Sequence, residues 1–135
     1  MAKIKKNNYV ALVIEDERPL LEAIRMKLEK NGFDVVGARK VEEAFNHMKD
    51  VEKIDAVWLD HYLLGSENGL DFLARIKQED SKWKNVPIFV VSNTASEDKV
   101  KSYLALGVNK YYTKSNHSLD KIIEDINDCL KRENC

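Results

Sequence analysis

Five short apolar runs alternate along this chain with amphipathic stretches, and this alternation constrains the fold more than any other feature. Most of the runs are continuously apolar, which is typical of strands in a parallel sheet that is covered on both faces. We therefore predict an α/β fold in which right-handed crossovers give an open sandwich. The predicted strands occupy residues 9–14, 33–38, 54–60, 86–92 and 108–113.

The stretches between the runs carry apolar residues at helical spacing. In the first stretch, Leu21, Ile24 and Leu28 recur every three or four residues, as on one face of a helix. In the last stretch, Ser118 precedes the apolar stripe and is the predicted N-cap. The predicted helices lie within residues 17–33, 40–51, 69–80, 96–107 and 118–134.

The length and charge of the chain limit the classes of function. Its 135 residues suit one domain, so we predict a single domain over residues 1–135 with its core at about residues 8–131. The 23 acidic residues nearly balance the 22 basic ones, so we expect no direct nucleic-acid partner. No stretch approaches the roughly 20 apolar residues of a membrane span. The apolar stretch near the start is only about six residues long and runs into three acids, so we expect that it is not a secretion signal. We therefore expect a cytoplasmic protein that does not enter a membrane.

Polar residues gather where four of the predicted strands end. In open α/β sheets, sites form at the carboxyl ends of the strands, beside a switch in strand order. If these strands are neighbours, several carboxylates, a hydroxyl and an ammonium group meet at one edge. The residues at these four ends are Glu15, Asp16, Glu17, Asp60, Ser92, Asn93, Thr94, Thr113, Lys114 and Ser115.

Crowded carboxylates repel one another unless a cation neutralises them, and Mg²⁺ suits a site with few carboxylates and several waters. A magnesium ion and Lys114 would also attract a phosphoryl group. Asp60 would then be a carboxylate nucleophile that forms an acyl phosphate. The alternative interpretation is that the four strand ends are unrelated and are polar only because each faces water. A functional site is favoured because the carboxylates, hydroxyl and ammonium group at these ends complement one another chemically.

These residues resemble those of the CheY-like receiver domain of two-component response regulators. The matching segments are the acidic pair in "VIEDE", the aspartate that ends "VWLD", the serine that ends "VPIFVVS", and the aromatic residue and lysine in "YYTK". The resemblance covers essentially the whole chain. It implies a flavodoxin-like (βα)5 sandwich with a five-stranded parallel sheet of order 2-1-3-4-5.

The resemblance also implies a phosphorylation site and its metal ion. Asp60 would accept the phosphoryl group from a phosphohistidine. Asp16 and Asp60 would ligate Mg²⁺ directly, together with the backbone carbonyl of Tyr62, and Glu15 would reach the metal through water. Lys114 would pair with the phosphoryl group.

Two further residues would form a switch in such a domain. The Ser92 hydroxyl would donate to the attached phosphoryl group, and Tyr111 would change rotamer as Ser92 moves. The family usually has Ala where this chain has Asn93, so we expect Asn93 and its neighbour Thr94 to modulate access to the site.

Two more departures from the family pattern affect loops. Ser115 stands where the family usually has proline after the lysine, so we expect a trans Lys114–Ser115 peptide and a differently aimed Lys114. After Asp60, the glycine that opens the next helix arrives one residue late, as Gly69, so we expect a longer loop there.

The implied function is that of a stand-alone receiver. Its partners would be a sensor histidine kinase or histidine phosphotransfer protein and a downstream protein target. It would be a monomer or a dimer promoted by phosphorylation. It would not be an enzyme with a separate substrate, since it would catalyse only its own phosphotransfer and dephosphorylation.

Two other classes fit the residues less well, and a third stays open. A flavin or nucleotide binder needs a Ser/Thr/Gly-rich loop after the first strand, where this chain has the acidic "EDERPL". A haloacid-dehalogenase-type phosphatase has a second aspartate two residues after its nucleophile, where this chain has Tyr62. The open alternative is a receiver-like binding module that acts without phosphate.

Several aromatic residues and one histidine need an interpretation of their own. We interpret His61 as a surface residue rather than a metal ligand, and Trp58, which alternates with Asp60, as a packing residue. Trp83 lies in the polar segment "QEDSKWKNVP" and is expected at the surface. Tyr112 is either a core residue or part of the surface through which the domain would contact its downstream target.

Overall fold

Five parallel strands form one sheet in the order β2-β1-β3-β4-β5. This arrangement confirms the α/β class and the strand order that the resemblance implies. The computed structural model describes residues 8–93 and 96–132 of the chain. The strands are β1 (Val10–Ile14), β2 (Asp34–Ala38), β3 (Ala56–Leu59), β4 (Ile88–Ser92) and β5 (Lys110–Thr113).

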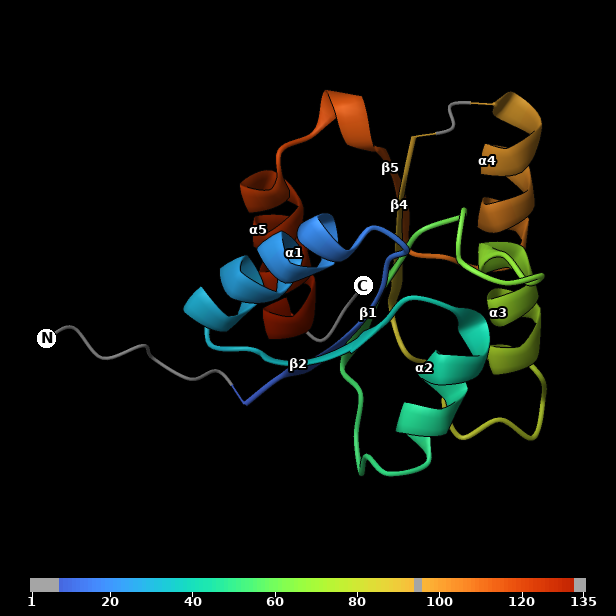
Figure 1. The fold of residues 1–135 in the computed structure, drawn as a ribbon, viewed down its shortest axis with the longest axis horizontal. Helices are drawn as coiled ribbons and strands as arrows, with labels where there is room; N and C mark the ends of the chain where they lie inside the picture. The colour runs from blue at the N-terminus through green and yellow to red at the C-terminus, as the bar shows by residue number, and fades with distance from the viewer. Residues whose placement is uncertain (1–7, 94–95, 133–135) are drawn as a thin grey trace, which may run out of the picture.

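Helices cover both faces of the sheet (Figure 1). Two of them, α1 and α5, lie on one face, and α2, α3 and α4 lie on the other. Within the described residues, every helix is too short or too polar to cross a membrane. The helices are α1 (Arg18–Lys30), α2 (Val41–Met48), α3 (Gly69–Ile76), α4 (Glu97–Ala105) and α5 (Leu119–Arg132).

Each strand points its side chains alternately into two apolar layers. From β1, Leu12 and Ile14 face the layer under α2, α3 and α4. Ala11 and Val13 face the layer under α1 and α5, and all four side chains are buried. Because both faces are covered, a polar residue at either kind of position would lie in a core. The continuous apolar runs of the sequence have this origin.

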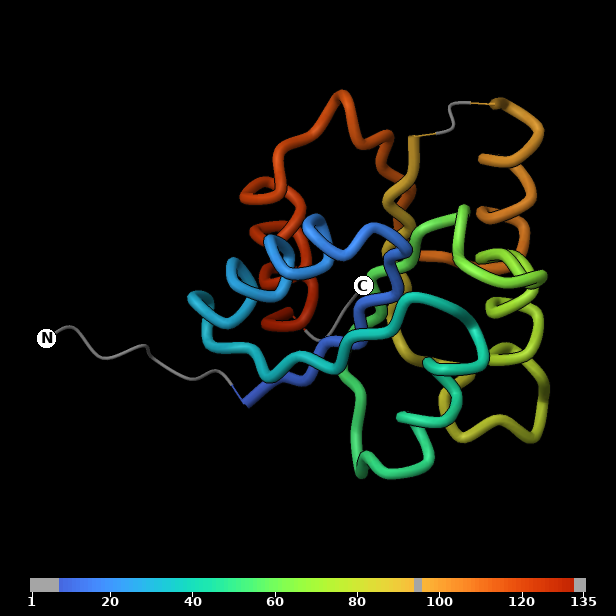
Figure 2. Tube along the Cα trace, viewed as in Figure 1, coloured from blue at the N-terminus to red at the C-terminus, as the bar shows by residue number. Residues whose placement is uncertain are grey.

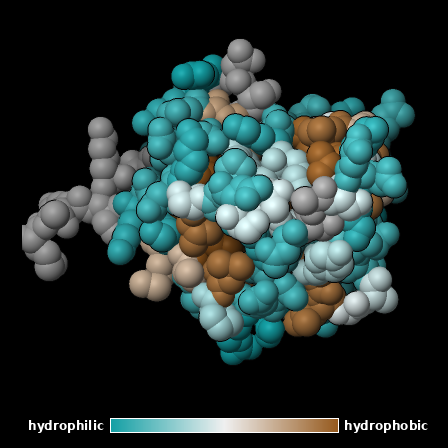
Figure 3. All heavy atoms as spheres, turned by 90° about the horizontal axis from the view of Figure 1, so that it is seen from above, coloured by the Kyte–Doolittle hydropathy of each residue, from teal (hydrophilic) through white to brown (hydrophobic). Residues whose placement is uncertain are grey.

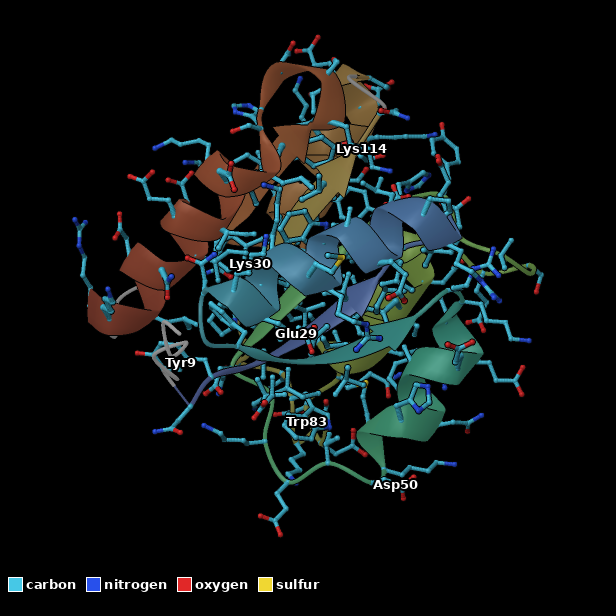
Figure 4. The ribbon with its side chains drawn as sticks, turned by 60° about the vertical axis from the view of Figure 1, so that its left-hand side comes forward. Tyr9, Glu29, Lys30, Asp50, Trp83 and Lys114 are labelled. Atoms are coloured by element: carbon cyan, nitrogen blue, oxygen red, sulfur yellow. The ribbon has the colours of Figure 1, made fainter. Side chains whose placement is uncertain are left out.

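The aromatic residues divide between the two layers. Trp58 is buried in the layer under α1 and α5, which confirms its packing role. Tyr112 is a core residue of the same layer, and its hydroxyl donates to Asp125 at 2.7 Å. Trp83 is half-buried and packs against the opposite layer, so it is only partly the surface residue that we predicted. Figure 4 shows Trp83 at the end of the molecule opposite Lys114.

The helix ends follow local sequence signals. Ser118 Oγ accepts a hydrogen bond from the Lys121 N–H at 3.1 Å, which confirms the predicted N-cap of α5. At the start of α3, Asn68 Oδ1 accepts from the Asp71 N–H at 3.1 Å, and Asp71 Oδ2 accepts from the Asn68 N–H at 2.8 Å. This reciprocal pair is a capping box, which fixes the direction in which α3 leaves the loop after β3.

Gly69 opens α3 where three segments meet. A Cβ at this position would overlap the hydroxyl oxygen of Tyr103 and lie 2.7 Å from the carbonyl oxygen of Asp60. The Gly69 N–H also donates to the carbonyl oxygen of His61 at 2.9 Å. Glycine is therefore required here for close approach, which brings α3 and α4 against the end of β3.

We expect Gly69→Ala to lower the free energy of unfolding by about 2 kcal/mol, because the new methyl group is overpacked against backbone and a buried hydroxyl. Gly37→Ala is the matched control, since its Cβ would mainly meet the flexible guanidinium end of Arg25. Urea denaturation of both variants measures the difference. Equal losses of stability in the two variants would contradict the close-approach argument.

Candidate functional site

The carboxyl ends of β1 and β3 lie next to each other and place two carboxylates at one edge of the sheet. The strands are in register, with Ile14 opposite Leu59, and the Asp60 N–H donates to the Ile14 carbonyl at 3.0 Å. Glu15 therefore follows β1 at the level where Asp60 follows β3. The two strands run side by side, and the chain then leaves them toward opposite faces of the sheet, into α1 after β1 and toward α3 after β3 (Figure 2).

Three carboxylates converge at this edge. One oxygen from each of Glu15, Asp16 and Asp60 lies within 4.8 Å of the other two. Glu15 and Asp60 are almost completely buried, at 0% and 2% exposure, and Asp16 is half-buried. Among the described residues, Asp60 Oδ1 is buried and has no hydrogen-bond partner. This set of hard oxygen donors, one of them unused, fits a divalent ion such as Mg²⁺.

Lys114 supplies the positive charge of the cluster. Its Nζ lies 2.8 Å from Glu15 Oε1 and 3.2 Å from Asp60 Oδ2, and its side chain is only 15% exposed. The Lys114–Ser115 peptide is trans, as expected, and a 3₁₀ turn follows at Lys114–Asn116. Despite that turn, Lys114 still points at the carboxylates, and Figure 4 shows it beyond the end of β5. The expectation of a differently aimed side chain is therefore wrong.

Burial shifts the proton affinities of these groups. Burial raises the pKa of Glu15 to about 8, aided by Asp16 and the Asp60 charge and opposed by Lys114. Burial likewise raises the pKa of Asp60, and Lys114 opposes that shift. Burial by itself would lower the pKa of Lys114, but its contacts with Glu15 and Asp60 raise it overall. Lys114 thus stays charged, and the metal-free cluster tends to hold a proton on Glu15.

Ser92 ends β4, and Tyr111 lies within the neighbouring strand β5. Ser92 is fully buried at the end of β4, and Tyr111 is half-buried against the layer under α4. Burial raises the pKa of Tyr111, and its side-chain hydrogen bond with Ser92 acts in the opposite direction. The structure therefore brings the two predicted switch residues into direct contact.

Two of the remaining predicted residues, Tyr62 and Asn93, follow the ends of β3 and β4. The side chain of Tyr62 points outward, with 51% of its surface exposed, and its hydroxyl accepts from Lys99 Nζ at 3.0 Å. Asn93 is exposed, and Thr94 lies outside the described residues. Seen toward the carboxyl ends of the strands, the surface is mostly hydrophilic, with separate apolar groups (Figure 3).

His61 is not the surface residue that we predicted. It is 4% exposed, and its Nδ1 lies 2.6 Å from the hydroxyl oxygen of Tyr103 on α4. Burial lowers the pKa of His61, and the nearby charge of Lys99 lowers it further. The partner is 42 residues away in the sequence, so no local pattern could have identified the pair.

Comparison with known proteins identifies the family. Residues 11–127 match the model of the response regulator receiver domain. The phosphate regulon transcriptional regulatory protein PhoB of Escherichia coli is 32% identical over 103 residues, which are 76% of this chain and 44% of PhoB. Chemotaxis protein CheY1 of Helicobacter pylori is 29% identical over 109 residues, 76% of this chain and 82% of CheY1. The chain thus spans less than half the length of PhoB.

Solved structures show the same fold. The crystal structure of a response regulator receiver protein from Pseudomonas putida matches with a TM-score of 0.82 and 27% identity, over 92% of this chain and 99% of that chain. The receiver domain of the Francisella response regulator 1452 matches with a TM-score of 0.80 and 25% identity, over 94% of this chain and all of that domain (100%). These likenesses confirm the resemblance that the strand-end residues indicated.

In the metal-free protein, we expect the free energy of unfolding to fall as the pH rises from about 4.5 to about 8. The pKa of Glu15 rises from its ordinary value of 4.5 to about 8 on folding. The retained proton stabilises the folded protein fully below pH 4.5, and this stabilisation is lost as the pH rises through about 8. Urea denaturation in the presence of a chelator, at a series of pH values, measures this dependence.

Glu15→Gln should remove most of this pH dependence, because the amide does not titrate. Glu42→Gln, which changes an exposed acid on α2, is the matched control. If Glu15→Gln and Glu42→Gln both keep the slope of the unmodified protein, Glu15 does not hold the proton.

Proposed function

The chain belongs to the response regulator receiver family, and on this basis we propose that Asp60 accepts a phosphoryl group from a phosphohistidine of a partner protein. Receiver domains of this family are signalling domains of two-component systems, and they bind Mg²⁺ at an acidic site. They interact with histidine kinases or phosphotransfer proteins and with downstream targets. The finer assignments below are proposals for this chain.

One observation carries the proposal: the two oxygens of the buried Asp60 carboxylate have different surroundings. Oδ2 lies 3.2 Å from Lys114 Nζ, whereas Oδ1 is buried without a hydrogen-bond partner among the described residues. A buried, unsatisfied carboxylate oxygen is costly unless a ligand uses it. An oxygen that binds a metal or attacks phosphorus would remove that cost.

The acidic cluster has the residues for a magnesium site. Asp16 and Asp60 would be direct ligands together with the carbonyl oxygen of Tyr62, and Glu15 would hold a metal-bound water. When bound, the ion supplies positive charge that offsets the charge of the transferring phosphoryl group. Binding would also require Glu15 to lose the proton that burial favours.

The transfer forms one phosphorus–oxygen bond and breaks one phosphorus–nitrogen bond. An Asp60 oxygen attacks phosphorus, the phosphorus–nitrogen bond to the donor imidazole breaks, and the imidazole leaves with its electron pair. Lys114 already lies beside Asp60 and would balance the charge on the phosphoryl oxygens. Little other chemistry is required of the protein beyond positioning.

After transfer, the Ser92 hydroxyl would donate to a phosphoryl oxygen. Ser92 would then leave its hydrogen bond with Tyr111, so Tyr111 would be free to change rotamer. Asn93 and Thr94 would modulate the rates of phosphate gain and loss. The readout would be a protein contact at the face formed by α4, β5 and α5, with no direct contact to nucleic acid.

Phosphorylation can be tested with acetyl phosphate and Mg²⁺ by intact-mass spectrometry. We expect one phosphoryl adduct on the unmodified protein, and none when Asp60→Asn removes the nucleophile or a chelator removes the ion. Asp50→Asn is the matched control, because Asp50 is exposed and lies at the opposite end of the molecule from Lys114 (Figure 4). Its adduct should equal that of the unmodified protein.

Two results would contradict the proposal. An adduct that survives Asp60→Asn would place the phosphoryl group elsewhere. The lack of an adduct under every condition would favour a receiver-like binding module that acts without phosphate.

A further inference from the structure

Helix α4 holds the loop that follows Asp60 through two side chains. Tyr103 is the buried residue of α4, and its hydroxyl oxygen lies 2.6 Å from His61 Nδ1. One turn earlier, Lys99 Nζ donates to the Tyr62 hydroxyl at 3.0 Å and lies 4.8 Å from the centre of that ring. Residues four apart share one face of a helix. The same face of α4 therefore contacts two consecutive residues of the loop.

The contact between His61 and Tyr103 is built into the interior. The side chains are 4% and 0% exposed, respectively, so a broken hydrogen bond would leave two buried polar groups without partners. Space for the Tyr103 hydroxyl exists only because residue 69 is glycine. The His61 carbonyl oxygen accepts from the Gly69 N–H at 2.9 Å, so both the backbone and the side chain of His61 are held.

His61 lies between the proposed nucleophile, Asp60, and Tyr62, whose carbonyl oxygen is the proposed metal ligand. The Tyr62 carbonyl oxygen belongs to the peptide between Tyr62 and Leu63, so its direction depends on the backbone angles of Tyr62. About half of Tyr62 is exposed, and its ring lies edge-on to the His61 ring at 4.7 Å, so a change in these angles would also move the two rings. The two contacts from α4 restrict that movement.

We propose that Tyr103 and Lys99 are positioning residues, which fix residues 61–62 so that the Tyr62 carbonyl group faces the metal site. This inference rests on the proposed metal-dependent phosphotransfer and adds a role for α4 to it. Because coupling between two sites is reciprocal, an ion bound at the acidic cluster should in turn hold α4 more firmly. The Tyr103 ring also lies 5.7 Å from the Tyr111 ring, so α4 contacts the switch residue as well.

Magnesium affinity, measured by calorimetric titration of the full chain, tests this assignment separately from phosphotransfer. Tyr103→Phe should weaken Mg²⁺ binding about fivefold, because the loop then populates arrangements that lack the carbonyl ligand. Lys99→Met should weaken it about twofold, since its contact is exposed. The Lys99→Met variant tests the positioning role at an exposed contact, where the substitution does not endanger folding.

Two matched controls separate positioning from general stability. Tyr112→Phe removes another buried tyrosine hydroxyl, whose partner Asp125 lies on the opposite face of the sheet, and should leave Mg²⁺ affinity unchanged. Lys101→Met removes an exposed α4 lysine that pairs with Glu97, and it should also leave affinity unchanged. His61→Asn should rescue affinity relative to His61→Leu, because the amide can still bond to the Tyr103 hydroxyl.

The outcomes distinguish this inference from the proposed function. If the unmodified protein binds Mg²⁺ and Tyr103→Phe and Lys99→Met bind it equally well, the positioning role is wrong and the metal site stands. If Tyr112→Phe weakens binding as much as Tyr103→Phe, the effect is one of stability, and the positioning role is again wrong. If the unmodified protein binds no Mg²⁺, both the metal site and the positioning role are wrong.

Discussion

The rest of the site depends on the ion pairs that the Lys114 ammonium group makes with two buried carboxylates. This group lies 2.8 Å from Glu15 and 3.2 Å from Asp60, two carboxylates that are almost completely buried. At an effective dielectric constant of about 20, two unit charges 4.8 Å apart repel each other by about 3.5 kcal/mol. One lysine cannot neutralise three carboxylates, so the cluster holds either a proton, as the raised pKa of Glu15 indicates, or a further cation.

The sheet explains why this unfavourable arrangement is held in place. The Asp60 N–H donates to the Ile14 carbonyl oxygen, so the hydrogen bonding between β1 and β3 extends to Asp60 itself. The strands that carry the cluster are buried on both faces, so their ends have little freedom to move apart. Helix α4 is different, because Tyr103 is its single buried residue. Apart from the contact between Tyr103 and His61, moving this helix costs little apolar packing, so α4 is a natural place for a signal to act.

The α/β class and the edge of the sheet at which the polar residues gather could be predicted because they follow from local patterns, whereas the strand order came from the family resemblance. Continuous apolar runs indicated a sheet covered on both faces, and the polar residues after those runs indicated the edge at which Glu15, Asp60 and Lys114 meet. The pair of His61 and Tyr103 could not be predicted, because it joins a loop to a helix 42 residues away. Tyr111 and Tyr112 are adjacent and similar, so only the pleat of the sheet decides which one faces α4.

The proposed function requires that Asp60, and not one of its acidic neighbours, carries the phosphoryl group. Borohydride reduces an aspartyl phosphate to homoserine, so the protein can be treated with acetyl phosphate and Mg²⁺, reduced, and digested for peptide mass spectrometry. We predict homoserine at position 60 and unchanged residues at Glu15 and Asp16. Reduction at Glu15 or Asp16 in place of Asp60, or no reduced residue at all, would contradict the account.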